Sequence, residues 1–138
     1  MAIIPLGINK SKVYEENQEI IIRKNPWIII KESCSYFGSS YFGRHAGTKK
    51  MIGVTHKSPI IIEETQGIIF FPTTSPRLDT CEWINYKKLS SYFNKNGKTF
   101  LTLSNGKNLE IDVSFGTFNN QVLRSSYLDS VLNQRKLN

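Results

Sequence analysis

The sequence SCSYFGSSYFGRHAGT (residues 33–48) concentrates glycines, hydroxyl side chains, aromatic rings and one arginine in a single short stretch. No acidic residue occurs between Glu32 and Glu63, although basic residues do occur there, namely Arg44, Lys49, Lys50 and Lys57. Glycine lets a neighbouring backbone approach closely, and hydroxyl and guanidinium groups donate hydrogen bonds to an anionic surface. This composition favours a nucleic-acid partner over a chemical reaction.

We expect a helix over about residues 40–52, because the apolar residues of this segment do not alternate as they would in a strand. Gly43 and Gly47 each cost about 1 kcal/mol in a helix relative to alanine, so they indicate close approach of another element or of DNA. A plainer alternative stays open, in which both glycines form a smooth face packed on a neighbouring element and Arg44 lies in solvent.

A phosphate-binding enzyme loop is the sharper alternative for the same stretch. Its nearest match is Gly38, four residues, and then Gly43-Arg44-His45. A nucleotide-binding P-loop has Gly-Lys-Ser/Thr at that point, where the lysine reaches the phosphates and the hydroxyl binds magnesium. Arginine followed by histidine cannot fill both roles, so we reject this alternative.

Composition supports a basic folded domain. The length of 138 residues suits a single domain over residues 1–138, and the 39% hydrophobic and 12% aromatic content argue against disorder. The net charge of +7 fits a polyanionic partner, such as nucleic acid or an anionic membrane surface. The apolar runs are far shorter than the about 20 residues of a membrane span, and the chain begins without a signal-peptide pattern. We therefore expect a cytoplasmic protein.

The first third of the chain reads as a small sheet. Residues 1–10 resemble an incomplete leader strand, interrupted by Pro5 and Gly7, and two short β-prone runs follow at residues 12–16 and 19–23. After Pro26, the triple isoleucine within residues 27–31 favours a buried strand.

Beyond the central helix, the pattern indicates more antiparallel strands. Two apolar strands are expected at residues 60–63 and 67–71, followed by a loop at residues 72–79 that carries Arg77 and is either a connector or an arm reaching into a groove. A meander follows, with strands at residues 82–93, 98–104 and 108–114. Asn-Gly pairs at residues 96–97 and 105–106 predict its hairpin turns.

The chain closes with a predicted helix from Thr117, as its cap, to about residue 134. Its apolar residues recur at helical spacing, namely Phe118, Val122, Leu128, Val131 and Leu132. The whole therefore reads as an α+β fold: an antiparallel sheet or meander, a central glycine-containing helix and a C-terminal helix.

No catalytic, metal or cofactor site is predicted. The two cysteines, Cys34 and Cys81, lack the spacing of a zinc or redox pair, and we read both as reduced, part-buried thiols. Cys34 with His45 or His56 could in principle form a thiol–imidazole pair, but no motif places them together. The sequence does not predict an enzyme.

Several blocks along the chain resemble the competence transcription factor (ComK) family of Gram-positive bacteria. The resemblance covers roughly residues 11–128, and the order of the blocks is specific: residues 34–40, 43–44, 47–48, 56–60, 70–73, 81–84, 104–107, 118–122 and 124. It implies a sequence-specific DNA-binding activator that reads paired AT-rich boxes, largely through the minor groove, as a homodimer or higher oligomer at the nucleoid.

Two arginines are the candidates for the groove under this resemblance. AT-rich minor grooves are narrow and carry enhanced negative potential, so Arg44 would insert there, with Arg77 as the second candidate. His45 could contribute when protonated. Phosphates would be held, and the register set, by Ser39, Ser40, Thr48, Lys49, Lys50 and Lys57.

The resemblance implies a chain shortened at both ends relative to longer family members, so turnover by an adaptor–protease system that recognises their C-terminal tail is not expected here. The alternative function is a regulatory paralogue that associates with a related factor and does not itself bind DNA. One contiguous basic face with Arg44 and Lys49 would favour DNA, and an exposed apolar sheet edge would favour a protein partner.

Overall fold

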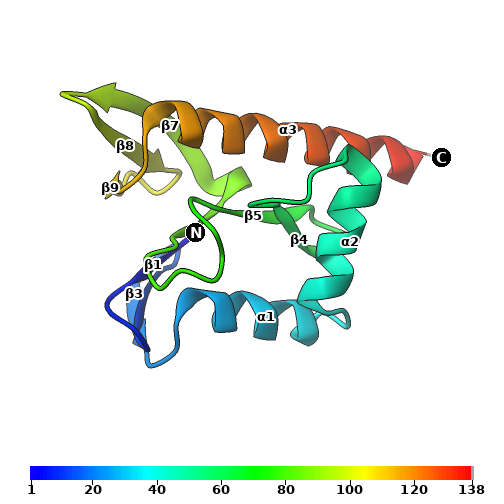
Figure 1. The fold of residues 1–138 in the computed structure, drawn as a ribbon, viewed down its shortest axis with the longest axis horizontal. Helices are drawn as coiled ribbons and strands as arrows, with labels where there is room; N and C mark the ends of the chain where they lie inside the picture. Colours follow the sequence, from blue (N-terminus) through cyan, green and yellow to red (C-terminus); the bar gives the residue numbers. More distant parts are fainter. Residues whose placement is uncertain (138) are drawn as a thin grey trace.

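The computed structural model describes residues 1–137 and contains two antiparallel sheets and three α-helices (Figure 1). The larger sheet has six strands in the order β3-β2-β1-β6-β5-β4. In chain order these strands are β1 (Ala2–Pro5), β2 (Ser11–Tyr14), β3 (Glu19–Ile22), β4 (Ile60–Glu63), β5 (Ile68–Pro72) and β6 (Trp83–Asn85). The predicted α+β class with antiparallel sheets is confirmed.

The smaller sheet is a three-stranded meander of β7 (Leu89–Lys95), β8 (Lys98–Leu103) and β9 (Asn108–Ile111). Its hairpin turns lie where the Asn-Gly pairs predicted them, with positive φ at Asn96, Gly97 and Gly106. The predicted first strand of the meander was too long. Asn85 accepts a hydrogen bond from the Lys87 amide at the start of a short 3-10 turn, η1 (Tyr86–Lys88), which ends β6 and leaves it in the larger sheet.

The predicted strand at residues 27–31 is wrong, because this segment lies in helix α1 (Pro26–Tyr36). The Asn25 side chain accepts a hydrogen bond from the Ile28 amide at 3.0 Å, and Pro26 occupies the first turn, where its missing N–H costs nothing. Ile30 and Cys34, one helical turn apart, are buried. Capping and burial of this face therefore override the β-preference of the isoleucines.

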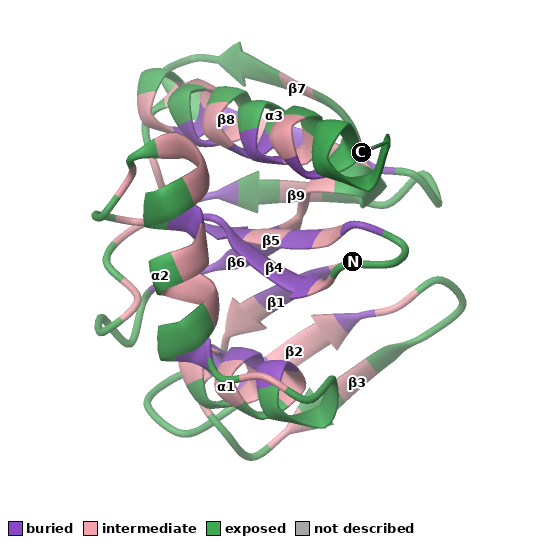
Figure 2. Cartoon of the chain, turned by 90° about the vertical axis from the view of Figure 1, so that its right-hand side faces the viewer, coloured by how far each residue is buried: buried purple, intermediate pink, exposed green. Residues whose placement is uncertain are grey.

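The central helix α2 (Tyr41–Ile52) matches its prediction closely. Ser40 caps its start by accepting from the Gly43 amide at 3.0 Å, and Gly53 ends it in the left-handed conformation with φ 74°. Figures 1 and 2 show α2 crossing one side of the molecule between α1 and the final helix, α3 (Phe115–Leu137).

Helix α3 begins earlier than predicted. Ser114 accepts a hydrogen bond from the Thr117 amide, so Ser114 is the capping residue and Thr117 lies within the helix. The fully buried stripe includes two polar side chains and only part of the predicted apolar set, namely Phe118, Gln121, Ser125, Leu128 and Leu132.

The larger sheet is buried on both faces at β1, β4, β5 and β6, where neighbouring residues alternate between the faces, and its edge strand β3 is partly exposed. Trp83 and Ile60 pack in a core cluster with residues of α1 and α2, such as Ile30 and Tyr41. On the opposite face, Ile84 packs with Phe118 of α3 and with leucines of the meander. Helix α2 is therefore fixed between two other helices while one of its faces stays in solvent.

Candidate nucleic-acid interface

Helix α2 has an inner and an outer face, and the predicted binding residues divide between them. Tyr41 and Thr48 are buried on the inner face, whereas Lys49 and Lys50 are exposed on the outer face in the last turn. Cations near a helix C-terminus also interact favourably with the helix dipole. The outer face further exposes Phe42, Gly43 and Ala46, so two small residues lie between the Phe42 ring at one end and two lysines at the other. We call it the α2 ridge: Ser40, Phe42, Gly43, Ala46, Lys49 and Lys50.

The glycines of α2 are not used to pack the helix against a neighbour. A Cβ at Gly47 would meet no atom within 4 Å, and one at Gly43 would approach only the nearby serine hydroxyls. Both glycines instead line a hollow of about 390 Å³ that also includes Arg44, Glu64 and Arg135. The plainer sequence interpretation, with both glycines packed on an adjacent element and Arg44 in solvent, is therefore wrong.

This first hollow, which we call the Arg44 hollow, contains an ion pair. A guanidinium nitrogen of Arg44 donates to Oε1 of Glu64, and only 17% of the Arg44 side chain is exposed. The Nε atom of Arg44 is buried and has no hydrogen-bond partner. Lys136 lines the same hollow and donates to the Thr65 carbonyl at 3.0 Å. The arginine that was predicted to read a groove is thus paired with a carboxylate of its own chain in this structure.

Thr48 cannot contact a phosphate in this conformation, because it is fully buried. Its hydroxyl donates to the Pro59 carbonyl at 2.6 Å, and the Arg44 carbonyl lies 3.2 Å away. A threonine within a helix often bonds the carbonyl four residues earlier. Here the stronger contact joins α2 to the segment that leads into β4, so the residue has a structural role.

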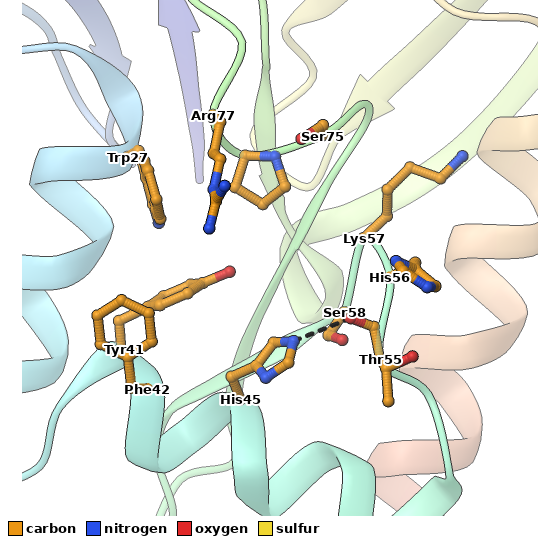
Figure 3. A pocket seen from close by; sticks show the side chains of 11 residues that line it. Trp27, Tyr41, Phe42, His45, Thr55, His56, Lys57, Ser58, Ser75 and Arg77 are labelled. Atoms are coloured by element: carbon orange, nitrogen blue, oxygen red, sulfur yellow. Dashed lines mark hydrogen bonds between the residues drawn. The ribbon is translucent and has the colours of Figure 1, made fainter.

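A second hollow lies on the other side of α2 and collects three of the predicted residues, His45, Lys57 and Arg77 (Figure 3). Its volume is about 430 Å³, and its walls include Trp27 and Tyr41. We call it the Arg77 hollow.

The residues of the Arg77 hollow come from four separate segments. His45 Nε2 lies 3.0 Å from the Thr55 carbonyl, and Arg77 extends from the loop between β5 and β6. Burial raises the pKa of Tyr41 to about 12, so its hydroxyl stays protonated at neutral pH. Trp27 joins them through α1, which the sequence analysis had placed in a strand.

No thiol–imidazole pair is formed at this hollow. Cys34 is fully buried in a core cluster with Trp83 and is absent from the residues that line the hollow. Burial raises the pKa of the Cys34 and Cys81 thiols, which disfavours the nucleophilic thiolate. Both cysteines are free and more fully buried than predicted.

Sequence reasoning missed the contribution of α3 to this region. Arg124 donates to the His56 carbonyl at 3.0 Å, and the buried Gln121 amide donates to the Lys57 and Pro72 carbonyls. These contacts fix the segment between α2 and β4 from behind. The sequence signal was Gln121, a polar residue at a position of α3 where the apolar spacing predicts burial. A buried polar side chain needs hydrogen-bond partners inside the protein.

The fold and these surfaces define a small basic α+β protein, with a cationic ridge flanked by two hollows that hold further cations. Within residues 1–137, no helix has the length and apolar character to cross a membrane, and no group of three potential ligand side chains is arranged to hold a metal ion.

The comparisons with known proteins then give the family. The chain belongs to the ComK family, since the family model described as ComK protein matches residues 1–137. It is 34% identical over 139 residues to the competence transcription factor of Bacillus subtilis (strain 168), covering 98% of this chain and 72% of that protein. The resemblance found in the sequence is confirmed, and the family is one of transcription factors and not of enzymes. No solved structure matches the chain.

Proposed function

We propose that this chain is a DNA-binding transcription activator of the competence type and that the α2 ridge faces the duplex. The observation that carries the proposal is the exposure of Lys49 and Lys50 on a helix face without acidic residues, between two hollows that hold Arg44 and Arg77. The relative's name, competence transcription factor, supports the same class of function.

The ridge provides positioning contacts to phosphates. Lysine side chains neutralise phosphates and release counterions, which gives affinity without reading sequence. Ser39 and Ser40 lie at the N-terminus of α2, whose free amide groups and positive dipole end attract anions. Gly43 and Ala46 present almost no side chain, so a sugar–phosphate backbone can approach the helix closely.

Arg44 and Arg77 are the candidates for reading AT-rich minor grooves. The narrow groove of AT-rich DNA attracts arginine through its negative potential. Arg44 must exchange Glu64 for DNA, and an ion pair with an exposed partner contributes only about 0–1 kcal/mol, so a groove can compete for it. Arg77 is exposed and needs no such exchange.

Recognition of paired boxes requires more than one copy of the chain. The minor groove distinguishes mainly A·T from G·C pairs, so a single copy reads little sequence information there. Specificity for two boxes at a fixed spacing then comes from a homodimer or higher oligomer. In this proposal residues 1–138 act as one DNA-binding domain at the nucleoid, in the cytoplasm.

A mobility-shift titration tests the proposal. The protein is mixed with a duplex of two AT-rich boxes or a GC-rich duplex of equal length, across a salt series. The double variant Lys49→Ala/Lys50→Ala should bind the AT-rich duplex roughly tenfold more weakly, and its salt slope should fall by roughly 2.

The matched control keeps the charge change but moves it away from the ridge. The double variant Lys95→Ala/Lys98→Ala removes two charges at the β7–β8 turn of the smaller sheet, far from α2 (Figure 1), and should bind like the unmodified protein. Equal binding to both duplexes, or equal losses in the ridge and control variants, would overturn the proposal.

A protein-interaction function is the second candidate, and one observation favours it. Strand β3 is an edge of the larger sheet, and 52% of Ile21 on this strand is exposed. Exposed edge strands can add a strand from another chain. If the chain binds no duplex alone but associates with a longer family member in sedimentation, and Ile21→Lys abolishes that association, this candidate replaces the first.

A further inference from the structure

We propose that the Arg77 hollow binds the phosphate group of a nucleotide. The inference rests on the proposed function in one respect, because DNA is one of two sources of that group and a free nucleotide is the other. The chemistry of the hollow comes from the aromatic, cationic and hydrogen-bonding groups that α1, α2 and two loops bring together.

The charge in the hollow is positive and uncompensated. Its lining includes two cations, Arg77, which points into the hollow, and Lys57, whose ammonium group is directed away from the centre (Figure 3), and it contains no carboxylate. Within residues 1–137, neither cation has an acidic oxygen within 4 Å, whereas Arg44 on the other side of α2 is paired with Glu64. A guanidinium with no internal partner is suited to a planar, charge-assisted contact with phosphate oxygens.

Neutral donors point into the same space. Figure 3 shows the Arg77 guanidinium and the Tyr41 hydroxyl directed toward one another across the hollow, with the indole nitrogen of Trp27 beside them. The Trp27 Nε1 atom is buried and completes no hydrogen bond, although the Tyr41 hydroxyl lies close enough for the indole N–H to oppose the rise in the pKa of Tyr41. An unpaired buried donor carries an energetic cost, which an entering oxyanion would remove.

The far wall of the hollow is formed before any ligand binds. Lys57 has the left-handed φ of 50°, unusual for a residue with a side chain, and its carbonyl accepts from the buried Gln121 amide at 2.8 Å. Arg124 holds the adjacent His56 carbonyl at 3.0 Å. Helix α3 therefore imposes the loop conformation, and the site requires little ordering on binding.

The aromatic groups favour a phosphate that carries a ring. The Phe42 ring is 67% exposed at the rim, where a base can stack on it. Lys31 Nζ lies 3.8 Å from the centre of the Trp27 ring and makes a cation–π contact with it, while the indole nitrogen of Trp27 faces the hollow. The volume of about 430 Å³ falls in the range of small-ligand sites.

The test follows the indole N–H resonance of Trp27 by ¹H–¹⁵N NMR, with Trp27→Phe used to assign the signal against that of Trp83. The titrants are deoxyadenosine monophosphate, deoxyadenosine, inorganic phosphate and hexaglutamate. We expect a saturable shift with the monophosphate, a smaller one with inorganic phosphate and none with the other two. Arg77→Gln should weaken monophosphate binding at least about fivefold, because one charge-assisted contact is lost.

Lys95→Gln is the matched control for loss of one positive charge, and it should leave the titration unchanged. Equal weakening in both variants would show general charge attraction and overturn the inference. A shift with hexaglutamate as large as that with the monophosphate would also overturn it, in favour of an acidic protein partner.

The AT-rich duplex separates the two sources of the phosphate. If free monophosphate leaves the Trp27 signal unchanged but the AT-rich and GC-rich duplexes both shift it, and Arg77→Gln weakens binding to both equally, the phosphate belongs to the DNA backbone and the inference stands. If Arg77→Gln weakens binding to the AT-rich duplex alone, Arg77 reads the minor groove and the inference fails. If no titrant and no duplex moves the signal, the inference fails. Loss of duplex binding in Lys49→Ala/Lys50→Ala would in that case still support the proposed function.

Discussion

The two arginines beside α2 have the same chemistry but different surroundings. Arg44 is mostly buried and paired with Glu64, whereas Arg77 is exposed on a loop with no ion-pair partner among the described residues. Both were expected to enter a DNA groove: Arg44 from a stretch without acidic residues, and Arg77 as the lone arginine of the loop at residues 72–79. The difference teaches that the availability of a cation is decided by distant carboxylates and not by its own segment.

The largest effect is expected when the contacts that support the loop of the Arg77 hollow are removed. Gln121→Leu deletes the amide that donates to the Lys57 and Pro72 carbonyls and leaves two carbonyls without a partner. We expect the free energy of unfolding to fall by about 2–4 kcal/mol, measured by urea denaturation. Gln134→Leu, an exposed position on the same helix, should change it by less than about 0.5 kcal/mol. Similar losses in both variants would refute the role given to Gln121.

Glu82 is a buried carboxyl that lies outside both hollows, and its protonation makes the stability of the fold depend on pH. Burial raises the pKa of Glu82 to about 7 from its usual 4.5. Between pH 4.5 and 7 the folded state holds this proton more tightly than the unfolded state does, so stability declines as pH rises through that range.

The variant Glu82→Gln should remove this decline, with a stability gain on the order of 2–3 kcal/mol at pH 8 and little change at pH 4. Thermal unfolding of both proteins at a series of pH values measures the effect. Parallel stability curves for the two proteins across this range would contradict the assignment.

Thr48 links helix α2, which carries Arg44, to the segment after Lys57, which borders the Arg77 hollow. Replacing its hydroxyl in Thr48→Val leaves the Pro59 carbonyl without this donor, and we expect a loss of about 1–2 kcal/mol in unfolding free energy. Thr48→Ser retains the hydroxyl and should lose less. If the serine variant is the less stable of the two, packing of the methyl group and not the hydrogen bond is what matters.

The smallest effect is expected from releasing Arg44 from its ion pair, which makes its surroundings more like those of Arg77. Glu64→Gln frees Arg44 without touching Arg77, so AT-rich duplex binding should tighten by about two- to fivefold, with stability changed by no more than about 1 kcal/mol. Glu110→Gln removes a negative charge in β9 and should have a smaller effect on duplex affinity. An equal gain from both changes would mean that only the net charge is important.

The parts of the fold that could be predicted from the sequence are those set by neighbouring residues. The Asn-Gly turns of the meander require positive φ at particular positions, so the residue types identify them. Helix α2 was predicted because the apolar residues between positions 40 and 52 do not alternate as in a strand, and the structure adds its Ser40 cap and its end at Gly53. Helix α1 was not predicted, because the strand preference of three isoleucines decided the interpretation and the Asn25-Pro26 cap was not recognised.

The candidate site was predictable in composition but not in arrangement. Eight of the nine predicted binding residues lie on the α2 ridge or line its two flanking hollows, and the remaining one, Thr48, is buried. Arg44 pairs with a carboxylate 20 residues away in the sequence. Trp27 of α1 and Arg77 of the β5–β6 loop line the same hollow, although 50 positions separate them in the sequence. Such contacts depend on tertiary packing, which local patterns do not encode.

The central place of β1 in the larger sheet has a consequence for synthesis in the cell. Ala2 and Ile3 pair with Ile84 and Trp83, so β1 gains its second partner only after about 80 more residues are made. At bacterial elongation rates of up to about 20 residues per second, that delay is at least roughly 4 s. During this interval an apolar strand pairs only with β2 on one side, so the nascent chain exposes an open strand edge that a chaperone can cover.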